Sequence, residues 1–206
     1  MDPADAWGAV QSARAAKEPP MFQRIEEGRA EKIRIGAAAA SLVKEGETIF
    51  LGSGTTVLEI AHHLPLDIHL TVITNSLPVL NELVKRPNIE LIVIGGMLRQ
   101  TELSMVGHIA EQDVHEFRAD KVFMGMRAID ARHGFTNDYL PETMTDRAIL
   151  SIAPQVIVVA DHTKFGKVSS VLVGQITIAD VIITDDFGPT DSLIELSEIG
   201  IEVVKV

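Results

Sequence analysis

Cysteine is absent from this chain of 206 residues, which excludes disulfides and thiolate metal sites. Aromatic residues make up only 4% of the sequence, so a hydrophobic core has to come mainly from Ile, Val, Leu and Ala. The hydrophobic share of 46% is still sufficient for one large α/β domain. Aliphatic packing of this kind is typical of a buried parallel sheet covered by helices.

Positive charge is also scarce, and long apolar runs are missing. The chain has 18 Lys and Arg residues against 29 Asp and Glu residues, which gives a formal net charge of -11. Acidic chains repel the DNA backbone, and the densest basic stretch, residues 24–34, is interleaved with glutamates. No apolar run approaches the roughly 20 residues that cross a bilayer, and residues 1–8 lack the pattern of a secretion signal. We therefore expect a cytoplasmic protein that binds no membrane.

The most informative motif is Leu-Gly-Ser-Gly-Thr-Thr at residues 51–56. It follows a short apolar run and precedes a helical pattern, so it predicts a strand, a tight loop and a helix. Gly52 and Gly54 let the backbone approach a ligand, and amides at a helix start attract an anion. Ser53, Thr55 and Thr56 add hydroxyl donors. The motif favours a phosphate cradle, although a plain turn with a threonine as helix cap fits the same residues.

Strand and helix patterns alternate along most of the chain. We expect strands at 48–51, 70–74, 90–94, 121–125, 155–160, 180–184 and 201–205, and helices at 56–64, 77–85, 107–117, 140–152 and 190–198. Before them we expect a linker or arm at residues 1–20 and a helix at 21–44. Gly46 is placed to end this helix, and its alanines at 37–40 allow close packing against another helix. The alternation predicts an α/β domain over residues 21–206, with a largely parallel Rossmann-like sheet flanked by helices.

Small and polar residues follow several of these strands. Ligands of open α/β sheets bind at the carboxyl ends of the strands, so we expect these residues to gather at one edge. Besides residues 52–56, the set comprises Thr74, Asn75, Ser76, Gly95, Gly96, Gly125, Asp161 and Lys164, and an expected lid at 134–142 adds Asn137, Asp138 and Glu142. A lysine can pair with phosphate, and carboxylates accept hydrogen bonds from sugar hydroxyls. Taken individually, Asp161 could equally well cap a helix or stabilise a turn, and Lys164 could equally well be a solvated surface lysine.

The histidines do not indicate a metal site. His62 and His63 are adjacent and cannot share one helix face, so with His69 they make a poor ligand set. We expect the first two near a helix end, where the helix dipole favours positive charge. No five-residue nucleophile elbow surrounds Ser53. We predict no metal, no cofactor and no catalytic residue.

Several short motifs occur in a fixed order along nearly the whole chain. They include Phe-Leu-Gly-Ser-Gly-Thr-Thr at 50–56, Val-Ile-Thr-Asn-Ser at 72–76, Ile-Gly-Gly-Met-Leu-Arg at 94–99, Gly-Phe-Thr at 134–136 and Asp-His-Thr-Lys-Phe-Gly at 161–166. In this order they resemble the C-terminal effector-sensing domain of DeoR-type transcriptional repressors. The resemblance implies a fold related to ribose-5-phosphate isomerase, a phosphorylated sugar or related metabolite as inducer, and a homo-oligomer (dimer or tetramer).

The resemblance also assigns residues and partners. By position, it places the phosphate loop at residues 53–56, lines the pocket with Asn75 and Gly95-Gly96, and makes Lys164 its cation. It implies that operator DNA is bound only through an N-terminal winged helix-turn-helix, which we expect to be missing from this chain. Residues 8–10 resemble the end of that module, and residues 18–36 resemble its connecting helix.

Two departures from the family pattern bear on which effector binds. The lid reads Gly-Phe-Thr-Asn-Asp-Tyr at 134–139 where Gly-Leu-Thr-Thr-Pro-Asp is common, and Asp146 stands where a lysine is common. The alternative function is an aldose–ketose phosphate isomerase, which needs a carboxylate base and a group that holds the enediolate oxygen. Glu142, Asp138 or Asp161 with Lys164 could supply both. No carboxylate pair resembles that enzyme's catalytic segment, so we predict a sensor and not an enzyme.

Overall fold

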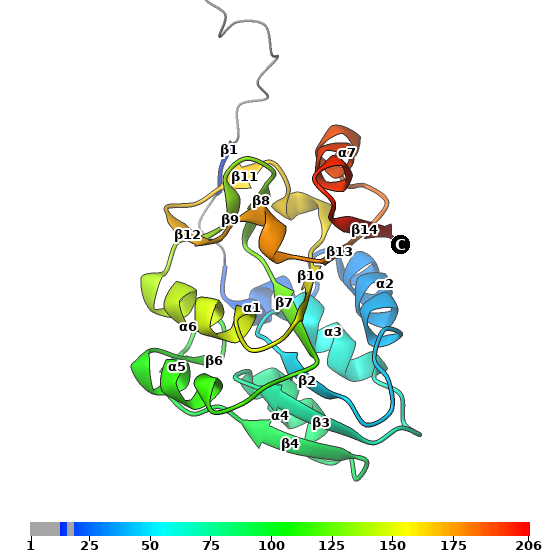
Figure 1. Ribbon diagram of the computed structural model, residues 1–206, viewed down its shortest axis with the longest axis vertical. Coiled ribbons are helices and arrows are strands. Elements are labelled where there is room, and N and C mark those ends of the chain that lie inside the picture. Colours follow the sequence, from blue (N-terminus) through cyan, green and yellow to red (C-terminus); the bar gives the residue numbers. More distant parts are fainter. Residues whose placement is uncertain (1–12, 16–18) are drawn as a thin grey trace, which may run out of the picture.

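The computed structural model describes residues 13–15 and 19–206 of the chain. Its centre is a sheet of seven strands, all parallel, in the spatial order β14-β13-β10-β7-β2-β3-β4 (Figure 1). The strands are β2 (Thr48–Leu51), β3 (Leu70–Thr74), β4 (Ile89–Val93), β7 (Lys121–Gly125), β10 (Gln155–Val159), β13 (Val181–Thr184) and β14 (Glu202–Lys205). The predicted fold class is confirmed, and each expected strand belongs to this sheet.

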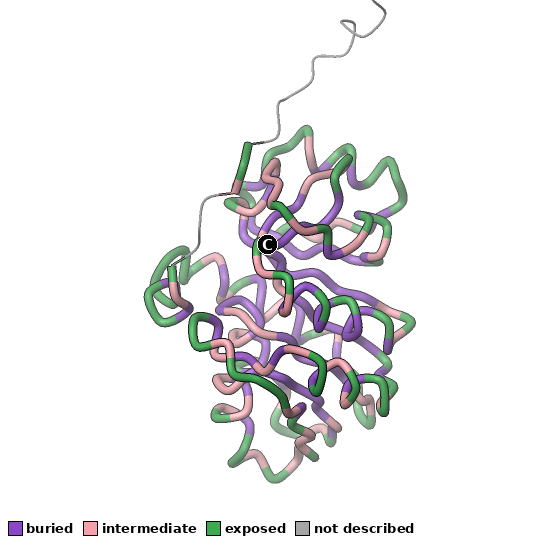
Figure 2. Tube along the Cα trace, turned by 90° about the vertical axis from the view of Figure 1, so that its left-hand side faces the viewer, coloured by how far each residue is buried: buried purple, intermediate pink, exposed green. Residues whose placement is uncertain are grey.

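Helices cover both faces of the sheet (Figure 1). They are α1 (Met21–Arg24), α2 (Arg29–Ala40), α3 (Thr55–His63), α4 (Leu77–Leu83), α5 (His108–His115), α6 (Leu140–Leu150) and α7 (Thr190–Glu198). Strand β2 contributes side chains to two hydrophobic cores, one on each face of the sheet. Ile49 and Leu51 pack with α2, α3 and α4, whereas Phe50 packs in the cluster that contains residues of α5, α6 and α7. Burial on both faces explains the aliphatic runs in the strands, and Figure 2 shows buried residues along the interior and exposed ones on the outer turns.

The expected helix at 21–44 is divided into two. Gly28 separates α1 from α2 and has a φ of 56°, in the left-handed region that favours glycine. Helix α2 ends at Ala40, before Gly46, which has a φ of 77° in the turn that leads to β2. Gly46 therefore shapes that turn and does not end the helix, which corrects the sequence-based expectation.

Helix α2 lies close against α3 at a glycine. A Cβ atom added to Gly36 would come within 2.5 Å of the Glu59 Cβ and 2.7 Å of the Glu59 carbonyl carbon. Ala39 and Ala40 are buried in the same core. The close helix packing expected of alanines 37–40 therefore occurs between α2 and α3 of the same chain.

Smaller sheets lie beside the main one. Strands β8 (Ala128–Asp130), β9 (Gly134–Asn137) and β12 (Val171–Gly174) form an antiparallel sheet, and β5 (Met97–Arg99) pairs with β6 (Ser104–Val106). The start of the expected lid is thus a buried central strand, because residues 134–137 pair on both sides. Only residues 138–139 separate β9 from α6, so this segment is not a free lid.

The expected arm at residues 1–20 falls mostly outside the described residues. Within it, β1 (Ala13–Arg14) pairs in parallel with β11 (Lys167–Val168). Short 3-10 helices, η2 (His162–Lys164) and η3 (Ile176–Ile178), complete the elements. In the described part of the chain, no helix is both long and apolar enough to cross a membrane.

Candidate ligand-binding cavity

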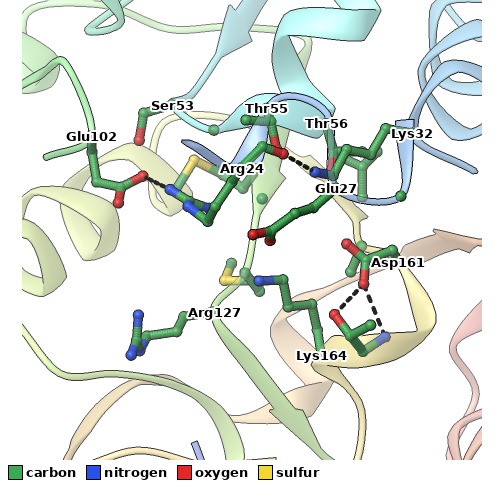
Figure 3. A pocket seen from close by; sticks show the side chains of 18 of the residues that line it. Arg24, Glu27, Lys32, Ser53, Thr55, Thr56, Glu102, Arg127, Asp161 and Lys164 are labelled. Atoms are coloured by element: carbon green, nitrogen blue, oxygen red, sulfur yellow. Dashed lines mark hydrogen bonds and ion pairs between the residues drawn. The ribbon is translucent and has the colours of Figure 1, made fainter. Parts of the chain in front are cut away.

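A cavity of about 150 Å³ lies at the carboxyl ends of β2, β7 and β10. This volume is below the roughly 300–1,000 Å³ typical of drug-sized ligand pockets, so it fits a small metabolite. Its walls come from the loop after β2, from β7, from η2, from the segment that contains α1 and the start of α2, and from β9 with α6 (Figure 3). The position agrees with the general rule for ligand sites in α/β sheets.

Helix α3 begins at the cavity wall. Gly54 is its N-cap residue, with a φ of 116°, and no side chain caps the helix. The first amides of an α-helix have no acceptor within the helix, so they can donate to a ligand in the cavity. Ser53, Thr55 and Thr56 line the same wall (Figure 3). The wall therefore offers amide donors, hydroxyl donors and the positive end of a helix dipole.

A second helix also begins at the cavity. Gly28 is the N-cap residue of α2, again without a side-chain cap, and it lines the cavity together with Lys32. Two helix N-termini without side-chain caps therefore meet at one cavity. This arrangement favours an anionic ligand, since each terminus contributes partial positive charge.

The lining is rich in charge of both signs. Five cationic side chains and six carboxylates line the cavity: Arg24, Lys32, Arg99, Arg127 and Lys164, with Glu27, Glu31, Glu102, Glu142, Asp146 and Asp161. Arg24 pairs with Glu102, and Arg99 pairs with Glu142. Arg127 pairs at 3.1 Å with Asp138, which is not a lining residue. Figure 3 shows Lys164 and Glu27 extending toward the same part of the cavity.

Lys32 is a buried cation in this wall, with 5% of its surface exposed. Its Nζ donates to the carbonyl oxygen of Arg24 at 2.7 Å. Burial lowers the pKa of Lys32, since the charged form loses water, while the charge of Asp161 acts in the opposite direction. An anion bound beside Nζ would offset this desolvation, so Lys32 is suited to an anionic ligand.

Another wall is formed by Asn137 and two carboxyl groups. The Asn137 amide nitrogen donates to Glu142 at 2.7 Å and to Asp146 at 3.5 Å. Burial raises the pKa of Asp146 well above its usual value, and the negative charge of Glu142 raises it further. The Arg99 guanidinium, which pairs with Glu142, lies 4.6 Å from the centre of the Tyr139 ring.

The η2 segment combines a structural role with a place in the wall. Asp161 caps η2 by accepting from the Thr163 amide at 2.9 Å, and it also lines the cavity. His162 donates its backbone N–H to Asp185 at 2.8 Å, and its ring lies 3.0 Å from the same carboxyl group. Burial alone would raise the pKa of Asp185, but hydrogen bonds from the His162 and Phe187 amides and from the His162 ring lower it.

Nine of the sequence-predicted ligand residues line this cavity: Ser53, Gly54, Thr55, Thr56, Gly125, Asn137, Glu142, Asp161 and Lys164. They come from four separate parts of the chain, which the parallel sheet brings to one edge. Their contact with a ligand stays a prediction.

The other seven predicted residues lie outside the lining: Gly52, Thr74, Asn75, Ser76, Gly95, Gly96 and Asp138. Thr74 Oγ1 donates to the Leu51 carbonyl at 2.7 Å, and Asn75 donates to the Met105 carbonyl at 2.9 Å. Ser76 is the N-cap of α4. These polar groups are engaged in holding strand ends and the β5–β6 hairpin, so the expectation that they line the pocket is corrected.

The glycines of this second set have packing roles. The Gly95 amide donates to Asp113 at 3.2 Å. Gly96 has a φ of 134°, and a Cβ there would come within 2.9 Å of the Val106 carbonyl oxygen. A Cβ at Gly52 would come within 2.5 Å of the Met124 sulfur, which belongs to a lining residue. Gly52 therefore shapes the cavity wall from behind, whereas Gly95 and Gly96 pack against α5 and β6.

Several lining residues were missed by sequence reasoning, chiefly Arg24, Glu27, Gly28, Lys32, Arg99, Glu102 and Arg127. Four of them precede the first strand of the main sheet, Arg99 and Glu102 lie in the β5–β6 hairpin, and Arg127 lies two residues after β7. The glycine at 28, within an otherwise helical pattern, was the available signal for a second helix start. Nothing local marks the pair Arg24–Glu102, whose members are separated by 78 positions.

Comparison with known proteins identifies relatives that share most of this chain. A transcriptional repressor, AccR, from Agrobacterium fabrum is 35% identical over 86% of this chain and 69% of its own length. A putative aga operon transcriptional repressor from Escherichia coli O157:H7 is 33% identical over 92% of this chain and 70% of its own length. The glycerol-3-phosphate regulon repressor of Escherichia coli K12 is 30% identical over 89% of this chain and 73% of its own length.

Solved structures show where else this fold occurs. Ribose 5-phosphate isomerase A from Methanocaldococcus jannaschii superposes with a TM-score of 0.50 and 17% identity, over 68% of this chain and 55% of the isomerase. The similarity establishes a shared fold. A family model described as the DeoR C-terminal sensor domain matches residues 27–186, which contain most of the sheet and the cavity. The chain therefore belongs to the DeoR C-terminal sensor domain family.

Proposed function

We propose that this domain senses a phosphorylated sugar or a related phosphorylated metabolite, which acts as the inducer of a DeoR-type transcriptional repressor. The name of one relative refers to the glycerol-3-phosphate regulon, which supports a phosphorylated metabolite as the ligand class. The chain is a regulator and not an enzyme in this proposal, in keeping with the repressor relatives.

The meeting of two helix N-termini at one cavity carries the proposal. Gly28 and Gly54 start α2 and α3 without side-chain caps, and Lys32 and Lys164 lie in the same lining. A phosphate group can accept hydrogen bonds from the free amides and hydroxyls at the start of α3 while the lysines balance its charge. The sugar hydroxyls would then face the carboxylates and Asn137.

The same geometry suggests how binding is transmitted. Residues 24–32, which precede the sheet in the chain, form part of the cavity wall. A ligand that contacts Lys32 and the start of α3 would hold α2 in one position, and it shifts the equilibrium only if it binds that position more tightly. In a full-length repressor, this segment would connect the cavity to the DNA-binding part.

The test is thermal unfolding in the presence of inorganic phosphate and a panel of phosphorylated sugars. A ligand at about 100 times its dissociation constant should stabilise the domain by roughly 2.7 kcal/mol. Thr55→Glu should abolish this stabilisation, because it places a carboxylate where the phosphate would sit. The matched control is Thr190→Glu, at the exposed start of α7, which should leave the response intact. Full ligand stabilisation in Thr55→Glu would contradict the proposal.

The alternative is an aldose–ketose isomerase, since Glu142, Asp161 and Lys164 all line the cavity. However, Glu142 is paired with Arg99 and accepts from Asn137, which holds it as a fixed acceptor. An assay with ribose 5-phosphate separates the two functions. Isomerisation that Glu142→Gln abolishes would favour the enzyme over the sensor.

A further inference from the structure

One wall of the cavity contains a carboxyl group that forms no ion pair with the described residues, although the charge of Arg99, which is paired with Glu142, acts on it. Glu102 and Glu142 are each paired with an arginine. Asp146 has only the long hydrogen bond of 3.5 Å from Asn137, although it is 8% exposed and lines the cavity. Its carboxyl group is therefore the unbalanced member of this cluster.

An ionised carboxylate in this position is unfavourable. Removing the group from water disfavours its charged form, and the neighbouring Glu142 adds repulsion, so the pKa of Asp146 is raised. A bound proton relieves both effects, and so does a bound cation. The cavity wall thus has a place for one positive charge beside Asp146.

The charge of the whole lining points the same way. Six carboxyl groups and five cationic side chains line the cavity, so the lining has one negative charge in excess when Asp146 is ionised, and a phosphate adds to that excess. A ligand with a cationic group beyond its phosphate would reduce this repulsion. Such a ligand would place its phosphate at the start of α3 and its cation at Asp146.

We propose that Asp146 selects an effector that carries an ammonium group in addition to phosphate, as a phosphorylated amino sugar does. The ammonium group pairs with the Asp146 carboxylate and takes the place of its proton. This inference rests on the proposed function, because it assigns the phosphate to the α3 wall.

The test compares matched sugars that differ in one group. Dissociation constants are measured by calorimetry at pH 7 for glucosamine 6-phosphate against glucose 6-phosphate, and for galactosamine 6-phosphate against galactose 6-phosphate. In the wild-type chain, at least one amino sugar should bind about tenfold or more tightly than its hydroxyl counterpart, as expected for a hydrogen bond to a charged group. Asp146→Asn should lose this preference and keep its thermal stabilisation by inorganic phosphate.

Glu116→Gln is the matched control. Glu116 is exposed and lies outside the cavity lining, so its charge is screened and the preference should survive its removal. Loss of the preference in Glu116→Gln would attribute it to total charge and would overturn the role of Asp146.

The outcomes separate the two proposals. If neither phosphate nor any of the sugars binds, the proposed function itself fails. If phosphate and the sugars bind but neither amino sugar is preferred by the wild-type chain, the inference on Asp146 is wrong while the proposed function stands. The wild-type comparison decides this point even if Asp146→Asn does not fold.

Discussion

We expect Lys32 to lower the stability of the ligand-free domain and to strengthen the binding of an anionic ligand. Its ammonium group is buried and has a lowered pKa because of desolvation. Lys32→Met should raise the free energy of unfolding of the ligand-free domain by about 1 kcal/mol, because an apolar side chain replaces a buried charge. The same change should weaken phosphate binding by about tenfold.

Urea unfolding and calorimetric titration with phosphate measure these two effects. Lys85→Met is the control, because Lys85 is exposed and lies outside the lining, and it should change neither quantity. A domain that becomes less stable and binds phosphate equally well after Lys32→Met would contradict the assignment.

Asp146 gives a pH dependence whose sign can be stated. Its pKa is raised in the folded state above the usual value of 3.8 by burial and by Glu142, so the folded state binds a proton that the unfolded state has released. The wild-type domain should therefore lose stability from this group as pH rises from about 4 through the folded pKa. Asp146→Asn lacks this loss, so its stability relative to wild type should increase with pH.

Urea unfolding between pH 4 and 8 checks this expectation. Glu102, Glu142, Arg99 and Asn137 are the polar neighbours that act on the group and are unchanged in both proteins. A stability difference that stays constant over this range would show that Asp146 titrates normally.

At the scale of the elements, the contact between α2 and α3 sets the position of both helix starts. Gly36→Ala should destabilise the domain by about 1–3 kcal/mol, because the added methyl group meets the backbone of Glu59 and cannot be accommodated by a side-chain rotation. The expected sign is the reverse of the usual helix propensity, which favours alanine over glycine. Thermal unfolding measures the change, with Arg34→Ala on the exposed side of α2 as the control. An increase in stability for Gly36→Ala would show that the helices can separate freely.

The sequence predicts the elements of the sheet well because their signal is local. Apolar runs such as residues 121–125 are followed by polar turns, and parallel pairing brings those turns together. The same logic places Ser53, Thr56 and Lys164 at the cavity. It fails for Asn75 and Gly95, because proximity to a strand end does not say which side of the sheet edge a residue faces.

Other parts depend on contacts that have no local signal. The β5–β6 hairpin brings Arg99 to the cavity, and the pairing of Arg24 with Glu102 joins positions 78 residues apart. Lys32 appears in the sequence as one more polar residue of a helix, and its burial depends on where Gly28 turns the chain. These features follow from the tertiary arrangement and not from periodicity.

At the scale of the whole molecule, ligand binding should reduce the local opening of the segment before the sheet, α1 and α2. Amide hydrogen exchange in α1 and α2 should slow when inorganic phosphate or a binding sugar phosphate is present, because residues 24–32 form part of the wall. Helix α7 lies outside the lining and serves as the internal control. Unchanged exchange throughout α1 and α2 with a saturating ligand would remove the support for coupling.

Association into a dimer or tetramer stays a prediction. The alanine-rich face of α2 is already packed against α3, with Ala39 fully buried. An interface between copies would have to use other surfaces, and sedimentation at high protein concentration would detect it.

The position of α1 matters for anyone who trims this protein to a minimal fragment. The family match begins at residue 27, but Met21 is 1% exposed and Arg24 forms an ion pair with Glu102 in the cavity wall. A fragment that starts at residue 27 would retain the seven-stranded sheet but lose α1, which contributes Arg24 to the cavity wall. Loss of ligand response in such a shortened protein would therefore reflect the missing wall, and fragments made for ligand screening should start upstream of residue 19.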